Sequence, residues 1–166
     1  MSEALEPWSE FNVAMVGATA ALAGLLIVAM SVNISTILTS KTLPARAAAS
    51  IATLVLAIAV TGLALVPAQP LWVYGTEVLV ATAFAAAFEV HAVSTILRDD
   101  LHRGSRLDLA GKSAAGVLPI VTYLVGAMLL LVGFTSAGLL VIGIATIVAI
   151  ASAILLAWVV LVEVLR

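Results

Sequence analysis

Long apolar stretches alternate with short polar segments along the whole chain. A helix needs about 20 largely apolar residues to cross roughly 30 Å of hydrocarbon, and five stretches of this sequence reach that length. They run from about residue 11 to 34, 44 to 66, 71 to 97, 113 to 134 and 138 to 164. The pattern predicts an all-α polytopic membrane protein, a five-transmembrane-helix bundle that forms a single integral membrane domain over residues 1–166.

Short polar segments separate the predicted helices. Pro44 suits the first turn of the second helix, because the N–H that a proline lacks has no partner there. Pro67 and Pro70 bracket a stiff turn after that helix, and the sequence Thr-Ser-Ala-Gly at 135–138 predicts a very short hairpin. Only residues 98–112 are long and polar enough for a real loop. We expect that loop on the cytoplasmic side of the membrane.

The basic residues predict the orientation of the chain. Short cytoplasmic loops are enriched in Lys and Arg, and the five-helix arrangement places all seven basic residues on one side. These residues are Lys41, Arg46, Arg98, Arg103, Arg106, Lys112 and Arg166. We therefore expect the N-terminus outside and the C-terminus in the cytoplasm.

The composition excludes several classes of protein. Charged residues make up only 10% of the 166 residues and hydrophobic residues 64%, whereas soluble domains carry about 25% charged residues. The net charge of −2 and the lack of a basic stripe argue against a nucleic-acid partner. The chain has no Cys and no nucleophile–base constellation. We expect a protein of the lipid bilayer that is not an enzyme and binds no metal or cofactor.

Small residues recur every four positions on three predicted helices, a spacing that lets helices pack closely in a membrane. In the first helix, Gly17 and Gly24 each have an alanine four residues away. The second helix has such a stripe from residue 45 to 61, and the fifth has Ala145, Ala149, Ala153 and Ala157. Such stripes serve either packing within one chain or an interface between copies. Three striped helices are many for so small a bundle, so we expect a homo-oligomer.

One carboxyl group is predicted inside the hydrocarbon layer. With the third helix centred near Ala85, Glu89 lies about 6 Å to the inner side of the midplane, at 1.5 Å per residue. Residues predicted at a similar depth are Thr53, Thr122, Tyr123 and Ser152. Two interpretations stay open. Glu89 is either a protonated carboxyl that is hydrogen-bonded inside the bundle, to partners such as Tyr123 or Thr53, or a site that handles protons or cations.

The third predicted helix is polar on two opposite faces. At about 100° per residue, Glu77 and His91 fall on one face and Glu89 on the other. A helix with polar groups on both faces is poorly suited to broad contact with lipid. We therefore expect this helix in the centre of the bundle, with one face towards its own chain and the other towards a pore or a neighbouring subunit.

The stretch Trp8–Asn33, WSEFNVAMVGATAALAGLLIVAMSVN, is followed by Leu43-Pro44-Ala45-Arg46 at the start of the second helix. Together they resemble a group of small five-helix bacterial membrane proteins, some of which are labelled "modulator of FtsH protease". The resemblance covers about the first third of the chain. It implies a multi-pass protein of the bacterial inner membrane, which is the cell membrane, with a membrane-anchored protease as a partner.

Two functional hypotheses follow. The first is a non-enzymatic accessory or regulatory subunit that acts as an oligomer through helix–helix association. The second is an oligomeric ion channel or proton-linked transporter in which the third helix lines the pathway. A channel needs Glu89, or the face with Glu77 and His91, to be exposed to a continuous wet pathway. An accessory subunit needs neither.

Overall fold

The computed structural model describes residues 3–39, 42–100 and 106–164. A 3-10 turn, Glu6–Trp8, leads into α1 (Ser9–Val32), α2 (Ile34–Thr39), α3 (Leu43–Leu63), α4 (Leu71–Asp100), α5 (Arg106–Val132) and α6 (Thr135–Val164). Within these described residues there are 5 helices long and apolar enough to cross a membrane. The prediction of an all-α fold with five helices of membrane-spanning length is confirmed.

The prediction of a loop over residues 98–112 is wrong. Helix α4 continues to Asp100 and α5 begins at Arg106, so most of that segment is helical. Residues 101–105 lie outside the described part of the chain. Charged residues end the apolar pattern, but they do not end a helix, because its backbone hydrogen bonds form in water as well as in lipid.

The turn between α5 and α6 is shorter than the predicted hairpin at 135–138. Helix α5 ends at Val132, and Gly133 adopts a φ of +98°, which an L side chain would oppose. The N–H of Phe134 then donates to the Leu129 carbonyl oxygen at 2.8 Å, and α6 begins at Thr135. This glycine-dependent reversal sets α5 and α6 antiparallel.

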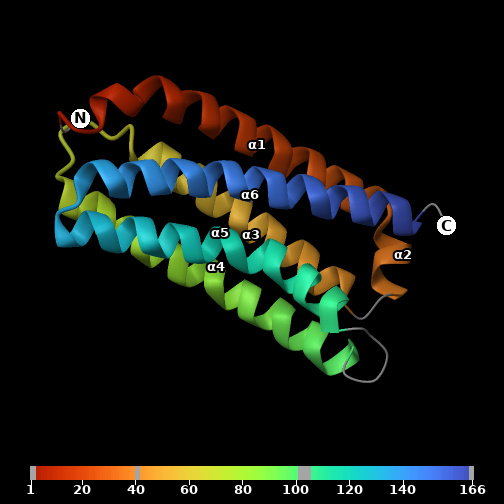
Figure 1. The fold of residues 1–166 in the computed structure, drawn as a ribbon. Coiled ribbons are helices and arrows are strands. Elements are labelled where there is room, and N and C mark those ends of the chain that lie inside the picture. Colours follow the sequence, from red (N-terminus) through yellow and green to blue (C-terminus); the bar gives the residue numbers. More distant parts are fainter. Residues whose placement is uncertain (1–2, 40–41, 101–105, 165–166) are drawn as a thin grey trace.

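The central helix of the bundle is α3. Among the described residues it contacts α1, α4, α5 and α6, whereas α4 contacts only α3 and α5. Figure 1 shows α1 and α4 at opposite edges, with α3 between them. The expectation that the third spanning helix lies in the centre is therefore wrong. An edge suits α4 because Phe84 and Phe88, which share the outer face with His91, are large apolar side chains that lipid accepts.

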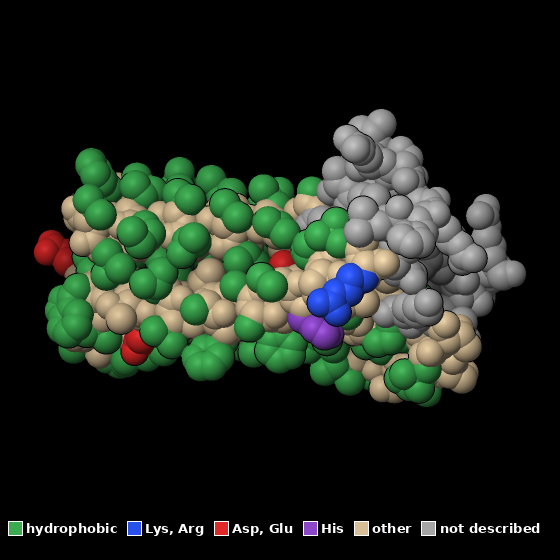
Figure 2. Space-filling view, turned by 90° about the horizontal axis from the view of Figure 1, so that it is seen from below, with side chains coloured by type: hydrophobic (Ala, Val, Ile, Leu, Met, Phe, Trp, Pro, Cys, Tyr) green, Lys and Arg blue, Asp and Glu red, His purple; other side chains and the backbone are tan. Residues whose placement is uncertain are grey.

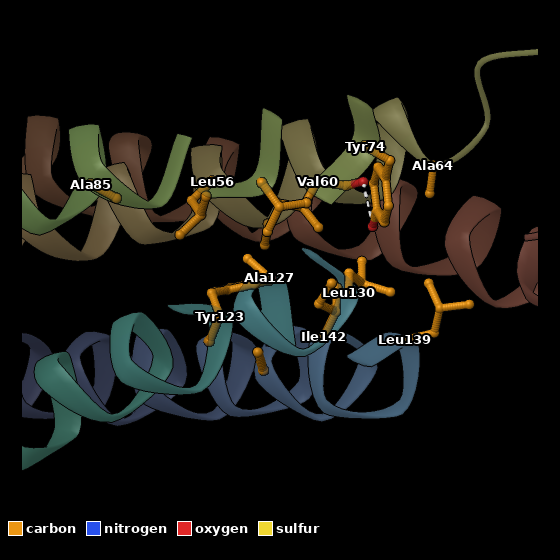
Figure 3. Close-up of a cluster of buried hydrophobic side chains, with 14 of the residues drawn as sticks. Leu56, Val60, Ala64, Tyr74, Ala85, Tyr123, Ala127, Leu130, Leu139 and Ile142 are labelled. Carbon is orange, nitrogen blue, oxygen red and sulfur yellow. Dashed lines mark hydrogen bonds between the residues drawn. The ribbon is translucent and has the colours of Figure 1, made fainter. Parts of the chain in front are cut away.

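The main core lies between the α3–α4 pair and the α5–α6 pair (Figure 3). Two fully buried tyrosines anchor it. The Tyr74 hydroxyl donates to the Val60 carbonyl oxygen at 3.3 Å. The Tyr123 hydroxyl lies 2.9 Å from Thr146 Oγ1, which itself donates to the Ile142 carbonyl oxygen. Both phenol groups thus have partners, as burial away from water requires.

The alanine stripe of α6 faces the inside of the bundle. Ala145 and Ala149 are 0% exposed and Ala153 is 5% exposed, while Ala157 packs against the same cluster as Ala153. The stripe on α3 is buried in the same way at Ala49, Thr53, Ala57 and Thr61. Both stripes therefore serve close helix packing within one chain.

Apolar side chains are spread over the described surface that Figure 2 shows, and many large ones are exposed. Two basic side chains are described, Arg46 near the start of α3 and Arg98 near the end of α4, and they lie at the same end of the bundle. Residues 41, 103 and 166 lie outside the described residues, and the side chains of residues 106 and 112 are not described. Figure 1 shows α1 beginning and α6 ending at opposite ends of the bundle, as an odd number of spans requires.

Candidate functional site

A cavity of about 270 Å³ lies between α3, α4, α5 and α6. It occupies the end of the bundle where α4 and α5 diverge from α1 and α6 (Figure 1). The polar side chains among its described lining residues are Arg46, Ser50, Thr53, Glu89 and Ser152. Small residues, among them Ala49, Ala92 and Gly116, line much of the rest and leave the space open. We call this space the Glu89 cavity.

Glu89 lies where α4 meets α5. Its side chain is only 7% exposed, and a Cβ atom on Gly116 would overlap its carboxyl group. The carboxyl thus occupies the space that a side chain on α5 would fill. No hydrogen bond among the described residues involves this carboxyl, whereas the Arg46 guanidinium interacts with it electrostatically. Glu89 therefore keeps its hydrogen-bonding capacity for whatever enters the cavity.

Helix α5 adds backbone polarity to the cavity wall. Pro119 lies inside the helix and has no N–H, so the Ala115 carbonyl oxygen loses its usual helical donor. Both residues line the Glu89 cavity. The carbonyl that lacks its usual helical donor thus belongs to a residue of the cavity wall.

The structure brings three of the five predicted polar residues together. Glu89, Thr53 and Ser152 line the same cavity, although they come from three different helices. The Thr53 hydroxyl donates to the Ala49 carbonyl oxygen of its own helix at 3.0 Å. Thr53, one of the partners that the packing interpretation suggested for Glu89, thus donates to its own helix instead.

Tyr123 and Thr122 lie away from Glu89. Tyr123 is buried in the main core, where it pairs with Thr146. The Thr122 hydroxyl donates to the Leu118 carbonyl oxygen at 2.8 Å, and neither residue lines the Glu89 cavity. These residues were expected near Glu89 because they lie at a similar predicted depth in the membrane. The rotation of α5 about its axis directs them away from the cavity.

Sequence reasoning missed Arg46 and Ser50 as cavity residues. Arg46 was assigned only to the basic side of the membrane, and Ser50 to no role. Their spacing with Thr53, four and then three residues, places all three on one face of α3. That polar periodicity in an otherwise apolar helix is the signal that could have identified them.

The second polar face of α4 does not form a common site. Gln69 Nε2 donates to Glu77 Oε2, which ties Glu77 to the turn before α4. The His91 side chain is exposed on the outer face of the bundle. These two groups are also separated by about 21 Å along the helix, at 1.5 Å per residue. They are therefore independent of each other and of the Glu89 cavity.

One small-residue stripe has no neighbour within the chain. Gly17, Ala21 and Gly24 fall within about 60° of one another on α1, and all three are exposed. A Cβ atom added to Gly17 or Gly24 would meet nothing within 4 Å. The buried residues of α1 lie on its opposite face and include Thr19 and Leu26. We call the three exposed residues the α1 outer face.

Comparison with protein-family models, with curated proteins and with solved structures finds no match to this chain. Within the described residues, the Glu89 cavity and the α1 outer face are the features on which we base functional proposals. They lie on different helices and are physically separate, so each can be altered without touching the other.

Proposed function

We propose that the protein is a non-enzymatic membrane protein that acts through helix–helix association, as an oligomeric accessory or regulatory subunit. The α1 outer face carries this proposal. The stripes of α3 and α6 are buried inside the chain, whereas Gly17, Ala21 and Gly24 are exposed. Lipid tails provide no hydrophobic drive for association, so small residues gain close van der Waals contact only from another helix.

A second copy of the chain is the partner that we propose for the α1 outer face. Two copies with the same membrane orientation can meet about a two-fold axis, with small residues facing small residues. The stretch Trp8–Asn33 that resembles the FtsH-modulator group contains this face. We also propose that the protein lies in the bacterial inner membrane and has a membrane-anchored protease as a further partner. Both are compatible with association through membrane helices.

A single cysteine on the α1 outer face is expected to cross-link two copies. The chain contains no Cys, so Ala21→Cys introduces its only thiol, and a disulfide forms only if two Cα atoms approach within about 7 Å. We expect a covalent dimer on mild oxidation in membranes. The matched control is Val125→Cys, which is 46% exposed on α5. Cross-linking that is equal at both positions, or absent at residue 21, would contradict the proposed interface.

We also propose that the N-terminus lies outside and the C-terminus in the cytoplasm, because the basic residues fall on one side of the five-span arrangement. A reporter fused after Arg166 should be active in the cytoplasm, and a reporter fused before Met1 should be active only outside. Detection of both termini on the same side would contradict five spans.

The Glu89 cavity favours a second candidate function, an ion channel or proton-linked transporter, because it places an intramembrane carboxyl beside an open space. Conduction needs a continuous pathway. The main core around Tyr74 and Tyr123 fills the bundle beyond the cavity, and the pocket beside Trp8 near the other end holds only about 10 Å³. A pathway would therefore need another conformation or an interface between copies.

Flux through liposomes distinguishes the two candidate functions. We expect that the wild type conducts neither protons nor cations. We also expect the Glu89→Gln variant to fold, since Gln keeps the shape of the side chain. Glu77→Gln is the matched control on the same helix. If the wild type conducts, and Glu89→Gln abolishes the flux while Glu77→Gln keeps it, the protein is a transporter or channel and the proposed accessory function is wrong.

A further inference from the structure

A small pocket lies at the end of the bundle where α1 begins (Figure 1). It has a volume of about 10 Å³ and is lined by residues of α1, α4 and α6, together with the turn before α1. Asn12, Tyr74 and Thr146 contribute polar side chains to its wall. We call this space the Asn12 pocket. It lies far from the Glu89 cavity and shares no described lining residue with it.

Two aromatic rings keep the Asn12 pocket small. Trp8 and Phe11 pack edge to face, with ring centroids 5.8 Å apart. A Cβ atom on Gly143 would lie 3.0 Å from Trp8 Cζ3 and 3.6 Å from the ring of Phe11. Because glycine lets both rings come this close to α6, the space that is left matches one water molecule and no larger neutral molecule.

Asn12 is a buried amide that lines this pocket. Its side chain is only 7% exposed, and no hydrogen bond among the described residues involves it. A side-chain amide has two N–H donors and a carbonyl oxygen that accepts. Burial of such a group without a partner costs free energy. A partner that enters the pocket would remove that cost.

The hydroxyl groups of the pocket keep the capacity to accept hydrogen bonds. A hydroxyl has one hydrogen to donate and two lone pairs that accept. The Thr146 hydroxyl donates to the Ile142 carbonyl oxygen at 3.1 Å, so Tyr123 is the donor in its 2.9 Å contact with Thr146 Oγ1. One lone pair of Thr146 is left. The Tyr74 hydroxyl donates to the Val60 carbonyl oxygen and keeps its lone pairs in the same way.

We propose that the Asn12 pocket binds one water molecule. The water accepts a hydrogen bond from the Asn12 amide and donates one to Thr146 Oγ1, and it thereby joins α1 to α6. The Tyr74 hydroxyl on α4 offers an acceptor for the second hydrogen, which gives the water the three hydrogen bonds typical of a buried site. This inference is independent of the proposed association through α1.

The depth of the pocket suits a bound water. Asn12 lies about 13 Å from the middle of α1, at 1.5 Å per residue, whereas half of the hydrocarbon layer is about 15 Å thick. The pocket is therefore close to the surface at which α1 begins. Water can reach it from there, and the burial of Asn12 then shields the bound molecule from bulk water.

Transfer of magnetisation from water to the Asn12 side-chain amide, measured by NMR in micelles, tests the proposal. The chain contains only two asparagines, Asn12 and Asn33, so labelling of asparagine nitrogen gives two signals, which the Asn33→Ala variant assigns. In the rotating-frame experiment, a bound water gives a cross-peak opposite in sign to that of proton exchange with bulk water. We expect the bound-water sign at Asn12. A wild type without this cross-peak would overturn the proposal.

Thr146→Val tests whether the water lies in this pocket. Valine keeps the shape of the side chain but removes the hydroxyl that accepts from the water, so the cross-peak at Asn12 should be lost. Thr82→Val is the matched control, because Thr82 is 2% exposed and donates to the Val78 carbonyl oxygen of its own helix. An unchanged cross-peak in a folded Thr146→Val variant would place the water elsewhere.

Hydrogen exchange shows whether the water holds the outer end of α1 in place. Asn12→Ala removes the amide that binds the water, so the backbone amides near the start of α1 should exchange about tenfold faster, the factor expected for one lost hydrogen bond. Asn33→Ala is the control, because Asn33 donates to the Ala29 carbonyl oxygen of its own helix region at 2.9 Å. Unchanged exchange in the Asn12→Ala variant would contradict the bridge.

Discussion

Replacing Ala149 and Ala153 together by Leu is expected to destabilise the folded bundle. Both side chains are buried within one chain, at 0% and 5% exposure, between α6 and its neighbours. Added methylene groups in a closely packed interior typically cost about 1–3 kcal/mol at each site. Because both residues also line the Glu89 cavity, part of the added volume can enter that space, so the cost falls in the lower part of this range.

The measurement is the thermal unfolding midpoint in detergent, followed by circular dichroism. Ala151→Leu is the matched control, because Ala151 is an exposed alanine on the same helix. We expect the double variant to lose its cooperative transition or to melt well below the wild type, and the control to melt close to it. A stable double variant that only changes oligomeric state would place the α6 stripe at an interface instead.

Replacing Gly17 and Gly24 together by Leu is expected to give folded monomers. Nothing in the chain opposes a side chain at either position, and Leu favours a helix over Gly by about 1 kcal/mol per residue. Bulk on the α1 outer face should nevertheless prevent a second helix from approaching closely. The fold and the association are thus separable by mutation.

Size measurement in nanodiscs, together with the unfolding midpoint, checks this prediction. Ala18→Leu is the control, since Ala18 is exposed on α1 about 100° away from Gly17. We expect the control to keep the wild-type subunit count. A double variant that keeps the wild-type count would remove the α1 outer face from the interface.

The spanning helices were predictable, but their ends were not. Crossing the bilayer demands a minimum apolar length, and that length is visible in the sequence. Nothing comparable marks where a helix stops in water, so the ends of α4 at Asp100 and of α5 at Arg106 were missed. The turn between α5 and α6 depends on the positive φ of Gly133. The pattern of apolar residues gives no information about that backbone conformation.

The polar site was predictable in depth but not in rotation. A rise of 1.5 Å per residue places Thr53, Tyr123 and Ser152 near the level of Glu89. Which of them face Glu89 depends on how each helix is rotated by its packing. Thr53 and Ser152 point into the cavity, whereas Tyr123 is held by Thr146. Gly116 was missed because its contribution is the absence of a side chain opposite Glu89.

The sequence analysis placed α4 in the centre because it assumed that a helix with polar residues on two faces must bury both faces. Glu77 is instead satisfied locally by Gln69, and His91 lies on the outer face. Burial of Glu89 alone needs only one packed face. That face is provided by α3 and α5.

The number of copies in the wild-type assembly tests the central claim, association through the membrane helices, most directly. Single-molecule photobleaching of the protein, labelled at one site and reconstituted at high dilution into nanodiscs, counts the subunits. The account predicts at least two copies in each particle, a count that falls to one in the Gly17→Leu and Gly24→Leu double variant. A single copy per wild-type particle across lipid compositions would contradict it.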